Sequence, residues 1–177
     1  MDPGLLEFRM SDRIEPCDYD LYSAAMFQWP ISNAFFHSVS LKRNIQAYIG
    51  HELAGYVWMN WNNENGYIQL IVVSEKFRGN GIGRLLLQKA EEWLAREGVR
   101  RVQLGGGGGY LWQGVPDGGQ DWFLHRGYSI DEVSIDMTMD LRLYVYPAWV
   151  DRRLPAGIVF RNAVPGDFDK LMIALTD

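Results

Sequence analysis

Residues 71–84 read Ile-Val-Val-Ser-Glu-Lys-Phe-Arg-Gly-Asn-Gly-Ile-Gly-Arg and continue into three leucines. The first residues are β-branched, as in a buried strand, and apolar residues at helical spacing follow the last. Between these segments, glycines stand at alternate positions, at Gly79, Gly81 and Gly83. Glycine permits a positive φ, so consecutive N–H groups can converge on one point, which here is also the positive end of a helix. The stretch therefore predicts a strand, a glycine turn and a helix that hold an anion, such as a phosphate or a pyrophosphate.

Two familiar phosphate-binding patterns do not fit this spacing. A P-loop requires lysine and then serine or threonine after its last glycine, whereas Arg84 and Leu85 follow here. The dinucleotide fingerprint requires a glycine three residues after Gly81, where the chain again has Arg84. The turn therefore belongs to neither of these classes.

The pattern Arg78-x-x-Gly81-x-Gly83 resembles the acyl-CoA pyrophosphate loop of the GNAT (GCN5-related) N-acetyltransferases. The resemblance extends upstream, because Ile71-x-Val73 precedes the loop as the central strand of that family usually does. It implies an α+β fold with three layers, α/β/α. The central sheet is expected to be mixed and mostly antiparallel, of the acyl-CoA N-acyltransferase type, with a splayed central cleft.

Composition limits the class of protein independently of any motif. The chain has 177 residues, enough for one domain with a substantial core, and its charged fraction of 22% is that of a globular protein. The net charge is −5 without a basic cluster, so we expect no nucleic-acid partner. No apolar run reaches the roughly 18 residues of a membrane span, and the first residues do not resemble a signal peptide. The single cysteine, Cys17, excludes an internal disulfide, and we expect a cytoplasmic protein with no membrane partner.

The remaining sequence predicts the order of elements around the glycine turn. Asp18-Tyr19-Asp20 is a candidate helix N-cap, Asn65-Gly66 is a strong turn signal, and Gly98 stands at a helix-ending position. Glu92 and Arg96 are spaced to form an ion pair on the helix after the turn. The predicted elements are a strand at 5–10, helices at 18–27 and 33–39, a hairpin of strands at 45–49 and 53–61, a turn at 62–66, a strand at 67–73, a helix at 82–97 and a strand at 101–104.

The chain departs from the commonest family pattern after this last strand. The glycines at 105–109 either form a surface loop or keep open the cleft in which the family holds the pantetheine arm. Residues 121–128 resemble the family's short helix, which ends in a Gly-aromatic pair. Many members carry a tyrosine there that protonates the departing CoA thiolate, whereas this chain has Phe123, which has no proton to donate. The variant, with Tyr110 and a Gly-x-Pro segment ahead of the helix, resembles a branch with two GNAT-like units in tandem.

The C-terminal part predicts a domain boundary. Residues 129–141 alternate between apolar and polar, which is typical of a half-exposed strand, and the prolines and mixed charge of 144–155 indicate a linker. Val-Phe-Arg and Asp-Phe-Asp at 159–169 then repeat Glu-Phe-Arg and Asp-Tyr-Asp at 7–20. We therefore predict a GNAT acetyltransferase domain at 1–143 and a linker at 144–157. Residues 158–177 are either the start of a second GNAT-like unit or a strand and helix that dock on the first domain or exchange with another subunit.

The resemblance implies direct transfer of an acetyl group from acetyl-CoA, as cosubstrate, to an amine of a small molecule or a peptide. One backbone N–H is sufficient to stabilise the oxyanion, and by resemblance this N–H and the pantetheine contacts come from Ile71, Val72 and Val73. The histidines and the cysteine lack metal-ligand spacing, so no metal is expected. The residues expected to hold the pyrophosphate are Arg78, Gly79, Asn80, Gly81, Ile82, Gly83 and Arg84.

An amine with a pKa of about 10 has to lose a proton before it attacks the thioester. Gln69 and Tyr67 lie on the strand where many family members place a base, and because neither is a carboxylate we expect deprotonation through water. Tyr110 is the candidate acid, since it follows the glycine run and stands near the predicted cleft. Trp29, Phe35 and Tyr67 are candidates to line the acceptor pocket.

Alternatives remain open at this point. Phe123 favours a non-catalytic acetyl-CoA sensor or a degenerate unit, and an interaction module with a merely structural glycine loop is a third reading. Several aromatic residues near the presumed pocket either belong to the core or offer a cation–π contact to an ammonium group. They are Trp29, Tyr56, Trp58 and Trp61. Phe36, next to Phe35, is likewise either a core residue or part of the pocket wall. A homodimer is also left open.

Overall fold

A computed structural model describes residues 6–26, 30–105, 115, 118–130, 145 and 164–167 of the chain. The chain divides into two compact units, Met1–Ser134 and Ile135–Asp177. The strand predicted at 129–141 lies, apart from its first two residues, outside the described residues. The elements are β1 (Leu6–Ser11), α1 (Pro16–Ala25), α2 (Asn33–Ser38), β2 (Arg43–Ile49), β3 (Glu52–Asn62), β4 (Asn65–Val73), η2 (Glu75–Phe77), α3 (Ile82–Arg96), β5 (Arg101–Leu104), α4 (Gln120–Leu124) and, in the second unit, η5 (Pro165–Asp167).

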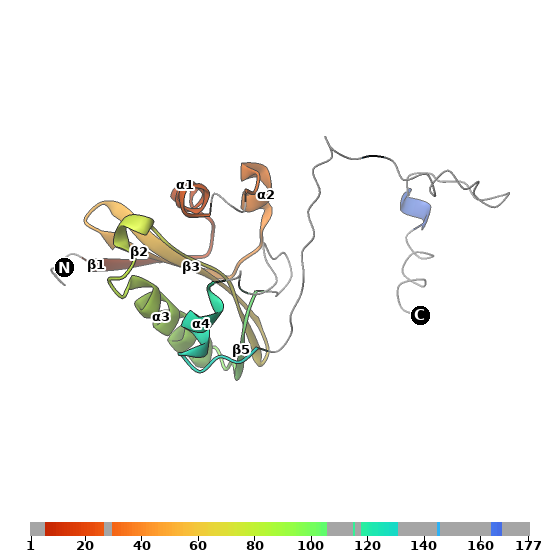
Figure 1. Cartoon of the computed structure of the whole chain (residues 1–177). Coiled ribbons are helices and arrows are strands. Elements are labelled where there is room, and N and C mark those ends of the chain that lie inside the picture. The colour runs from red at the N-terminus through yellow and green to blue at the C-terminus, as the bar shows by residue number, and fades with distance from the viewer. Residues whose placement is uncertain are drawn as a thin grey trace. The chain divides into compact units, whose positions relative to one another are not determined.

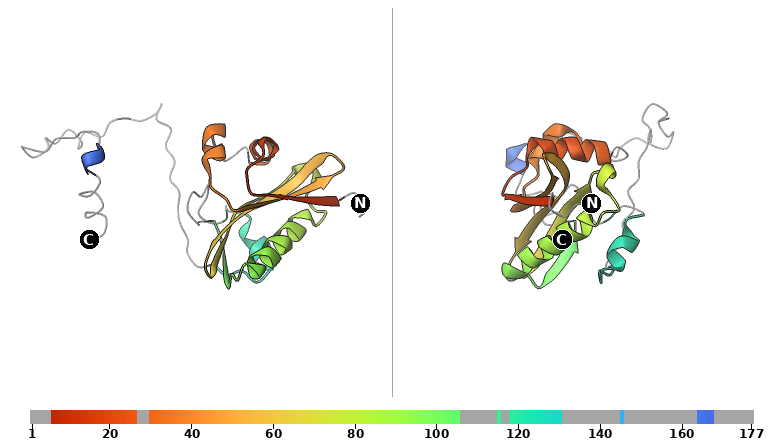
Figure 2. Two further views of the ribbon diagram at one scale, coloured as in Figure 1. Left: turned by 180° about the vertical axis from the view of Figure 1, so that it is seen from behind. Right: turned by 90° about the vertical axis from the view of Figure 1, so that its left-hand side faces the viewer.

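The strands form one sheet in the order β1-β2-β3-β4-β5. The first three pairs are antiparallel and the β4–β5 pair is parallel. Figure 1 shows α1 and α2 over one face of the sheet and α3 and α4 over the other, and both views in Figure 2 show the same layers. Because a parallel pair requires a crossover connection, α3 passes across the sheet between β4 and β5. The predicted three-layer fold with a mixed, mostly antiparallel sheet is confirmed.

The layer between α3 and the sheet is aliphatic. Ile82, Leu86, Ala90 and Leu94 are buried at helical spacing, as the sequence predicts, while Trp93 is only half-buried. Full burial of each leucine side chain contributes about 1.5–3 kcal/mol. The helix ends as expected, because Gly98 adopts a φ of +84°.

On its solvent face, the predicted ion pair between Glu92 and Arg96 is absent from the ion pairs of the described residues. Glu92 instead accepts a hydrogen bond of 2.9 Å from the Gln88 side chain one turn earlier. The sequence therefore correctly predicts that Glu92 pairs with a polar residue one turn away, but the partner is Gln88 and not Arg96.

The layer between the sheet and α1–α2 is aromatic. Tyr22, Phe36, Tyr56 and Trp58 are all at most 1% exposed, and the Phe36 and Trp58 ring centroids lie 4.6 Å apart. Phe36, Tyr56 and Trp58 therefore belong to the core and are closed to a ligand. The half-buried Trp61 already has the Lys42 ammonium 5.1 Å from its ring centroid.

The first turn of α1 differs from the predicted cap. Glu15 is the N-cap and Pro16 the first helical residue, where its missing N–H removes no helical bond. Asp18 lies in the third helical position, and its Oδ2 accepts the Glu15 backbone N–H at 2.9 Å. Asp18 therefore caps the helix from inside its first turn.

Asp18 is also the centre of a polar cluster beneath α1. Its side chain is fully buried, and its two carboxylate oxygens accept the Gln46 Nε2 at 2.6 Å and the Asn44 Nδ2 at 2.7 Å from β2. Its backbone carbonyl accepts the Tyr56 hydroxyl at 3.1 Å. Burial raises the pKa of Asp18, and hydrogen bonds from Glu15, Gln46 and Asn44 oppose that rise. The cluster joins α1 to two strands of the sheet.

The raised pKa of Asp18 predicts a particular pH dependence of stability. The Asp18 carboxyl group holds its proton more tightly in the folded state than in the unfolded chain. Its protonation therefore contributes most to the free energy of unfolding below the ordinary carboxyl pKa of about 3.9. This contribution is lost as pH rises through the pKa of the folded state. We expect wild type to lose stability relative to Asp18→Asn as pH increases from about 4. The melting temperatures of wild type and Asp18→Asn, measured as pH rises from about 4, give the difference in stability. The other carboxyl groups are the same in both proteins, so their effects cancel in this difference. A constant difference would contradict the prediction.

The turn between β3 and β4 lies earlier than the Asn65-Gly66 signal suggests. Asn63, with a φ of +42°, and Glu64 form the turn, and Asn65 and Gly66 are the first residues of β4. A Cβ on Gly66 would lie 2.9–3.1 Å from the side chains of Val99 and Leu94. The glycine is therefore required by packing beneath the end of α3.

Gly55 on β3 is predicted to tolerate no side chain. A Cβ there would lie 2.7 Å from the Val72 carbonyl oxygen and 3.1 Å from Leu86 Cδ1. We expect Gly55→Ala to lower the free energy of unfolding by about 1–3 kcal/mol, because backbone and helix would have to separate. Urea denaturation measures this. Gly66→Ala is the comparison: its Cβ would meet side chains only, at 2.9–3.1 Å, which can shift more readily than the Val72 backbone, so its loss should be smaller. An equal or larger loss for Gly66→Ala would contradict the explanation.

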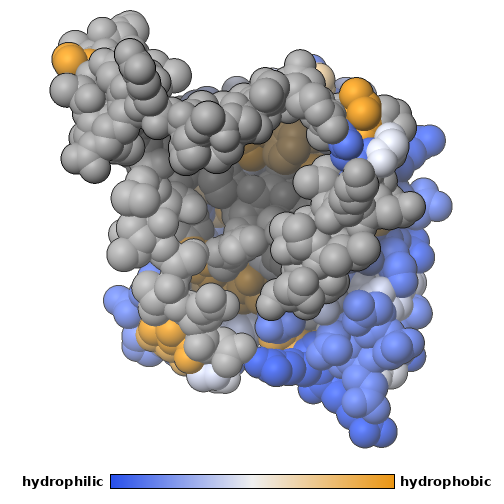
Figure 3. All heavy atoms as spheres, turned by 90° about the vertical axis from the view of Figure 1, so that its right-hand side faces the viewer, coloured by the Kyte–Doolittle hydropathy of each residue, from blue (hydrophilic) through white to orange (hydrophobic). Residues whose placement is uncertain are grey.

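Exposed hydrophobic residues are few in the described part of the first unit. On the side shown in Figure 3, the coloured hydrophobic residues form small separate groups, and hydrophilic residues gather at the right. The exposed large hydrophobic residues of this unit's described part are Met10, Phe35, Leu124 and Ile130. None of the helices in that part has the length and apolarity needed to cross a membrane.

Candidate functional site

The sheet opens in the middle of β4. β5 pairs with β4 only from Asn65 to Ile68, and the Gly105 N–H donates the last bond, to Ile68 O at 2.8 Å. At this point the β3–β4 register shifts, so that Gln69 is the extra residue on β4. A bulge bends its strand and increases the local twist. β4 then continues to Val73 along β3, with no β5 beside it in the described chain.

The open edge of β4 presents backbone N–H groups. The Ser74 N–H donates to Ala54 O on β3 at 2.9 Å. Because N–H groups along a strand alternate in direction, those of Val73 and Ile71 point to the opposite, open edge. The backbone N–H of Val72 faces β3, as that of Ser74 does, and the Val72 side chain is buried beneath α1 and α2. The geometry therefore favours Ile71 and Val73 over Val72 as donors to a ligand in the opening.

The glycine turn follows directly from this edge. Gly79 and Gly81 adopt left-handed φ values of +76° and +81°, which glycine takes without strain. The first helical bond of α3 runs from the Leu85 N–H to Gly81 O at 3.1 Å. The N–H groups of Ile82, Gly83 and Arg84 precede it and have no acceptor one turn back. The positive end of α3 therefore lies at an exposed turn, as the sequence predicts.

Polar side chains of the turn have two different roles. The Asn80 Nδ2 donates to the carbonyls of Phe77 and Arg78 at 3.3 and 3.2 Å, which ties the turn to η2. The Arg84 side chain folds back, with Nη2 at 4.0 Å from the position of a Gly81 Cβ. Its positive charge thus lies over the turn, whereas Asn80 shapes the backbone.

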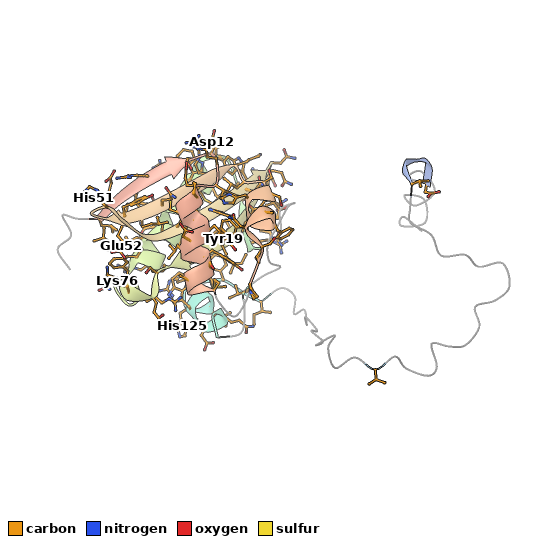
Figure 4. The ribbon with its side chains drawn as sticks, turned by 90° about the horizontal axis from the view of Figure 1, so that it is seen from above. Asp12, Tyr19, His51, Glu52, Lys76 and His125 are labelled. Carbon is orange, nitrogen blue, oxygen red and sulfur yellow. The ribbon has the colours of Figure 1, made fainter. Side chains whose placement is uncertain are left out.

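η2 has a further support from the neighbouring hairpin. Figure 4 shows Glu52, at the start of β3, beside Lys76 of η2, and the Lys76 Nζ lies 2.5 Å from Glu52 Oε2. Both side chains are more than half exposed, so the pair contributes at most about 1 kcal/mol.

Arg78 connects three elements. Its Nε donates to Val73 O at 3.1 Å, at the end of β4, and its Nη2 to Ala25 O at 3.5 Å, at the end of α1. Its guanidinium is thus engaged with backbone carbonyls, and the residue positions the turn against α1. Sequence reasoning placed Arg78 only among ligand contacts, because the α1 partner is distant in sequence.

Arg78→Ala is expected to lower the free energy of unfolding by about 1 kcal/mol, since both carbonyls lose a charged donor. Arg78→Lys should not restore it, because lysine lacks the planar fork that reaches both carbonyls. Urea denaturation measures the loss. The control is Arg100→Ala, which removes an exposed ion pair with Glu64 and should cost at most about 0.5 kcal/mol. Equal losses would contradict the positioning role.

α4 borders the turn from the other side. Phe123 is 8% exposed and packs edge-on against Trp122 and Tyr128, in the aliphatic layer. Tyr128 donates its hydroxyl to Glu91 at 2.8 Å, and burial together with this bond raises the pKa of Tyr128. Neither residue is suited to donate a proton near neutral pH. The Trp122 ring lies beside Gly83, with Cζ2 at 3.5 Å from the position of a Cβ there.

Sequence analysis did not identify the position of Trp122. Trp122 lies beside Gly83 because of the way α4 packs on α3. A single tryptophan does not form a sequence pattern from which this position could be predicted. The same holds for Arg126, which stacks on its ring.

The predicted acceptor and proton-transfer residues are only partly described. Phe35 is 51% exposed on α2, Tyr67 is half-buried on β4, and Gln69 is 2% exposed at the bulge. Figure 4 shows Tyr19 on α1 near α2; its hydroxyl donates to Ile31 O at 3.0 Å. The other two candidates, Trp29 and Tyr110, lie outside the described residues. In the described part of the chain, no group of three or more potential metal ligands occurs.

A three-layer fold with an opened sheet edge leading into a glycine turn defines the acyl-CoA N-acyltransferase class. The chain matches the Acetyltransferase (GNAT) family over residues 5–107 and belongs to that family. Among proteins with curated functions, none matches the chain in sequence.

Solved structures share the fold. A Pyrococcus furiosus protein described as an acetyl transferase is 24% identical over 75% of this chain and all of its own, with a TM-score of 0.58. A GNAT family acetyltransferase from Streptococcus pneumoniae is 15% identical over 76% of this chain and 98% of its own, with a TM-score of 0.55. The glucosamine N-acetyltransferase region of a fungal β-N-acetylglucosaminidase is 23% identical over 72% of this chain and 17% of the fungal chain, with a TM-score of 0.60.

Proposed function

We propose that this GNAT acetyltransferase moves an acetyl group from acetyl-CoA directly to an amine of a small molecule or a peptide. The observation that carries the proposal is the continuity of two features. Among the residues that the structure describes, no strand pairs with the β4 edge beyond Ile68, and this edge leads within a few residues into the exposed turn at the start of α3. A pantetheine arm in the opening and a pyrophosphate on the turn would be held by one continuous stretch of backbone. We also expect the protein to act in the cytoplasm, since its single cysteine suits a reducing compartment.

The chemistry requires few side chains. The N–H groups of Ile71 and Val73 are suited to hold the thioester and the oxyanion. Arg84 and the N–H groups at residues 82–84 would take the pyrophosphate. The amine would lose its proton through water near Gln69 and Tyr67.

The leaving group needs little help from an acid. A thiol has a pKa of about 8.5, so the thiolate of CoA is a fair leaving group near neutral pH. The replacement of tyrosine by Phe123 therefore does not argue against transfer. Tyr110 stays the candidate if an acid takes part.

The test is release of free thiol from acetyl-CoA with a panel of amines that covers polyamines, amino sugars, amino acids and peptides. Thiol release that depends on one class of amine supports the proposal and names the acceptor. If acetyl-CoA raises the melting temperature but no amine gives release, the chain is a sensor. If no CoA species shifts the melting temperature, acetyl-CoA is not its cosubstrate.

We further propose that residues 158–177 begin a second GNAT-like unit. The described part of the second unit supports this, because the Val164 N–H donates to Asp167 Oδ2 at 2.9 Å and the Asp167 N–H to Val164 O at 2.8 Å. Glu15 and Asp18 make the same two bonds at 2.9 and 3.0 Å, and both segments have the order X-Pro-x-Asp. A repeated sequence with a repeated cap indicates a repeated unit. The boundaries at 143 and 157 stay predictions.

A further inference from the structure

Trp122 and Arg126 form a fixed pair beside the first turn of α3. The Arg126 guanidinium carbon lies 3.8 Å from the Trp122 ring centroid, and the Arg126 Nη1 donates to the Trp122 carbonyl oxygen. The Trp122 ring in turn lies beside the turn, with Cζ2 at 3.5 Å and Cη2 at 4.0 Å from the position of a Cβ on Gly83. A cation–π contact and a hydrogen bond thus hold one positive charge on the indole ring that borders the turn.

This charge is available to a ligand. Arg126 is exposed, and its hydrogen bond to Trp122 uses one of five guanidinium N–H groups. Within the described residues, no carboxylate forms an ion pair with Arg126. The stack also pre-orders the side chain, so less rotamer entropy is lost when an anion binds.

The charge is placed for a second anion. The turn itself offers the N–H groups of residues 82–84 and the Arg84 side chain that folds over Gly81, which are sufficient for one pyrophosphate. Arg126 follows the end of α4 and reaches the neighbourhood of the turn through the Trp122 ring, on which it stacks. The CoA molecule carries one phosphate group besides the pyrophosphate, on the 3′-oxygen of its ribose.

We propose that Arg126, held on Trp122, binds the 3′-phosphate of CoA and makes the chain prefer CoA to dephospho-CoA. This inference rests on the proposed function, since it requires the pyrophosphate on the α3 turn. Trp122 is the positioning residue and Arg126 the specificity-determining one. Arginine suits this role because its planar fork takes a phosphate in a bidentate geometry.

The experiment measures the dissociation constants of CoA and dephospho-CoA by calorimetry, for the full chain and for Arg126→Gln. Wild type should bind CoA about tenfold more tightly than dephospho-CoA, as one charge-assisted contact provides. Arg126→Gln should lose this preference, because its affinity for CoA falls while its affinity for dephospho-CoA stays the same. Arg126→Lys should retain part of it, because the charge stays while the fork is lost.

The matched control is Arg96→Gln, which removes another exposed arginine, at the far end of α3, and should leave the preference unchanged. Equal weakening of both ligands by Arg126→Gln would overturn the inference, as would a wild type that binds both equally; in either case the proposed function stands. If wild type binds neither ligand, the proposed function itself fails.

Discussion

Gly81→Glu should lower the affinity for acetyl-CoA by about a hundredfold or more. The new side chain would start from the N-cap of α3, where the backbone N–H groups of residues 82–84 meet. Its carboxylate would occupy the place of the pyrophosphate and repel it. Loss of two charge-assisted hydrogen bonds alone corresponds to such a factor. Equilibrium binding by calorimetry, or the rise in melting temperature with acetyl-CoA, measures the effect.

Gly98→Glu is the matched control for this change. Gly98 has a φ of +84°, against +81° for Gly81, and neither position has backbone within 4 Å of an added Cβ. Both variants therefore carry a similar backbone strain, about 1–2 kcal/mol, at opposite ends of one helix. Binding that survives in Gly98→Glu and is lost in Gly81→Glu assigns the effect to the turn. Equal loss in the two variants would show that helix strain, and not the turn, is responsible.

Asp18→Ala should lower the free energy of unfolding by about 3–5 kcal/mol. The substitution removes the acceptor of the Gln46 and Asn44 side chains and of the Glu15 N–H. Buried donors left without an acceptor cost about 1–3 kcal/mol each. For a domain of this size, we expect the melting temperature to fall by roughly 10 °C or more. Urea denaturation and thermal melts measure the two quantities.

Asp20→Ala provides the comparison on the same helix. Asp20 is exposed two residues further along α1, so its removal should change stability by at most about 0.5 kcal/mol. Similar losses for both variants would mean that helix propensity or net charge, rather than the buried cluster, explains the result. Acetyl-CoA binding should persist in folded Asp18→Ala, because the cluster lies beneath α1 and makes no contact with the α3 turn.

Local sequence patterns were sufficient to predict the fold and the glycine turn before α3, because both depend on residues that are close in the chain. The strand before the turn, the left-handed glycines at 79 and 81, and the apolar stripe of α3 follow from backbone preference and periodicity. These are properties of neighbours in the chain. They were sufficient to identify the family, and the structure agrees at each of these positions.

Local patterns misled where packing decided the outcome. Asn65-Gly66 is a strong turn signal, yet Gly66 is required by the side chains of Leu94 and Val99, and the turn forms at Asn63. Asp18 looks like an N-cap, yet it lies within the first turn, because Pro16 has to take the first helical position. In both cases a residue has two compatible local roles, and contacts distant in sequence choose between them.

The site shows the same division. Spacing identified the residues of the turn, but only the tertiary structure showed that Arg78 is engaged with carbonyls of β4 and α1. It also decided that β4 opens after Ile68 and that Trp122 and Arg126 border the turn. Strand register and the packing of one helix on another arise from contacts between segments far apart in the chain. The sequence shows which chemical groups are present and how they are spaced. The contacts that determine what each group can bind become known only from the folded structure.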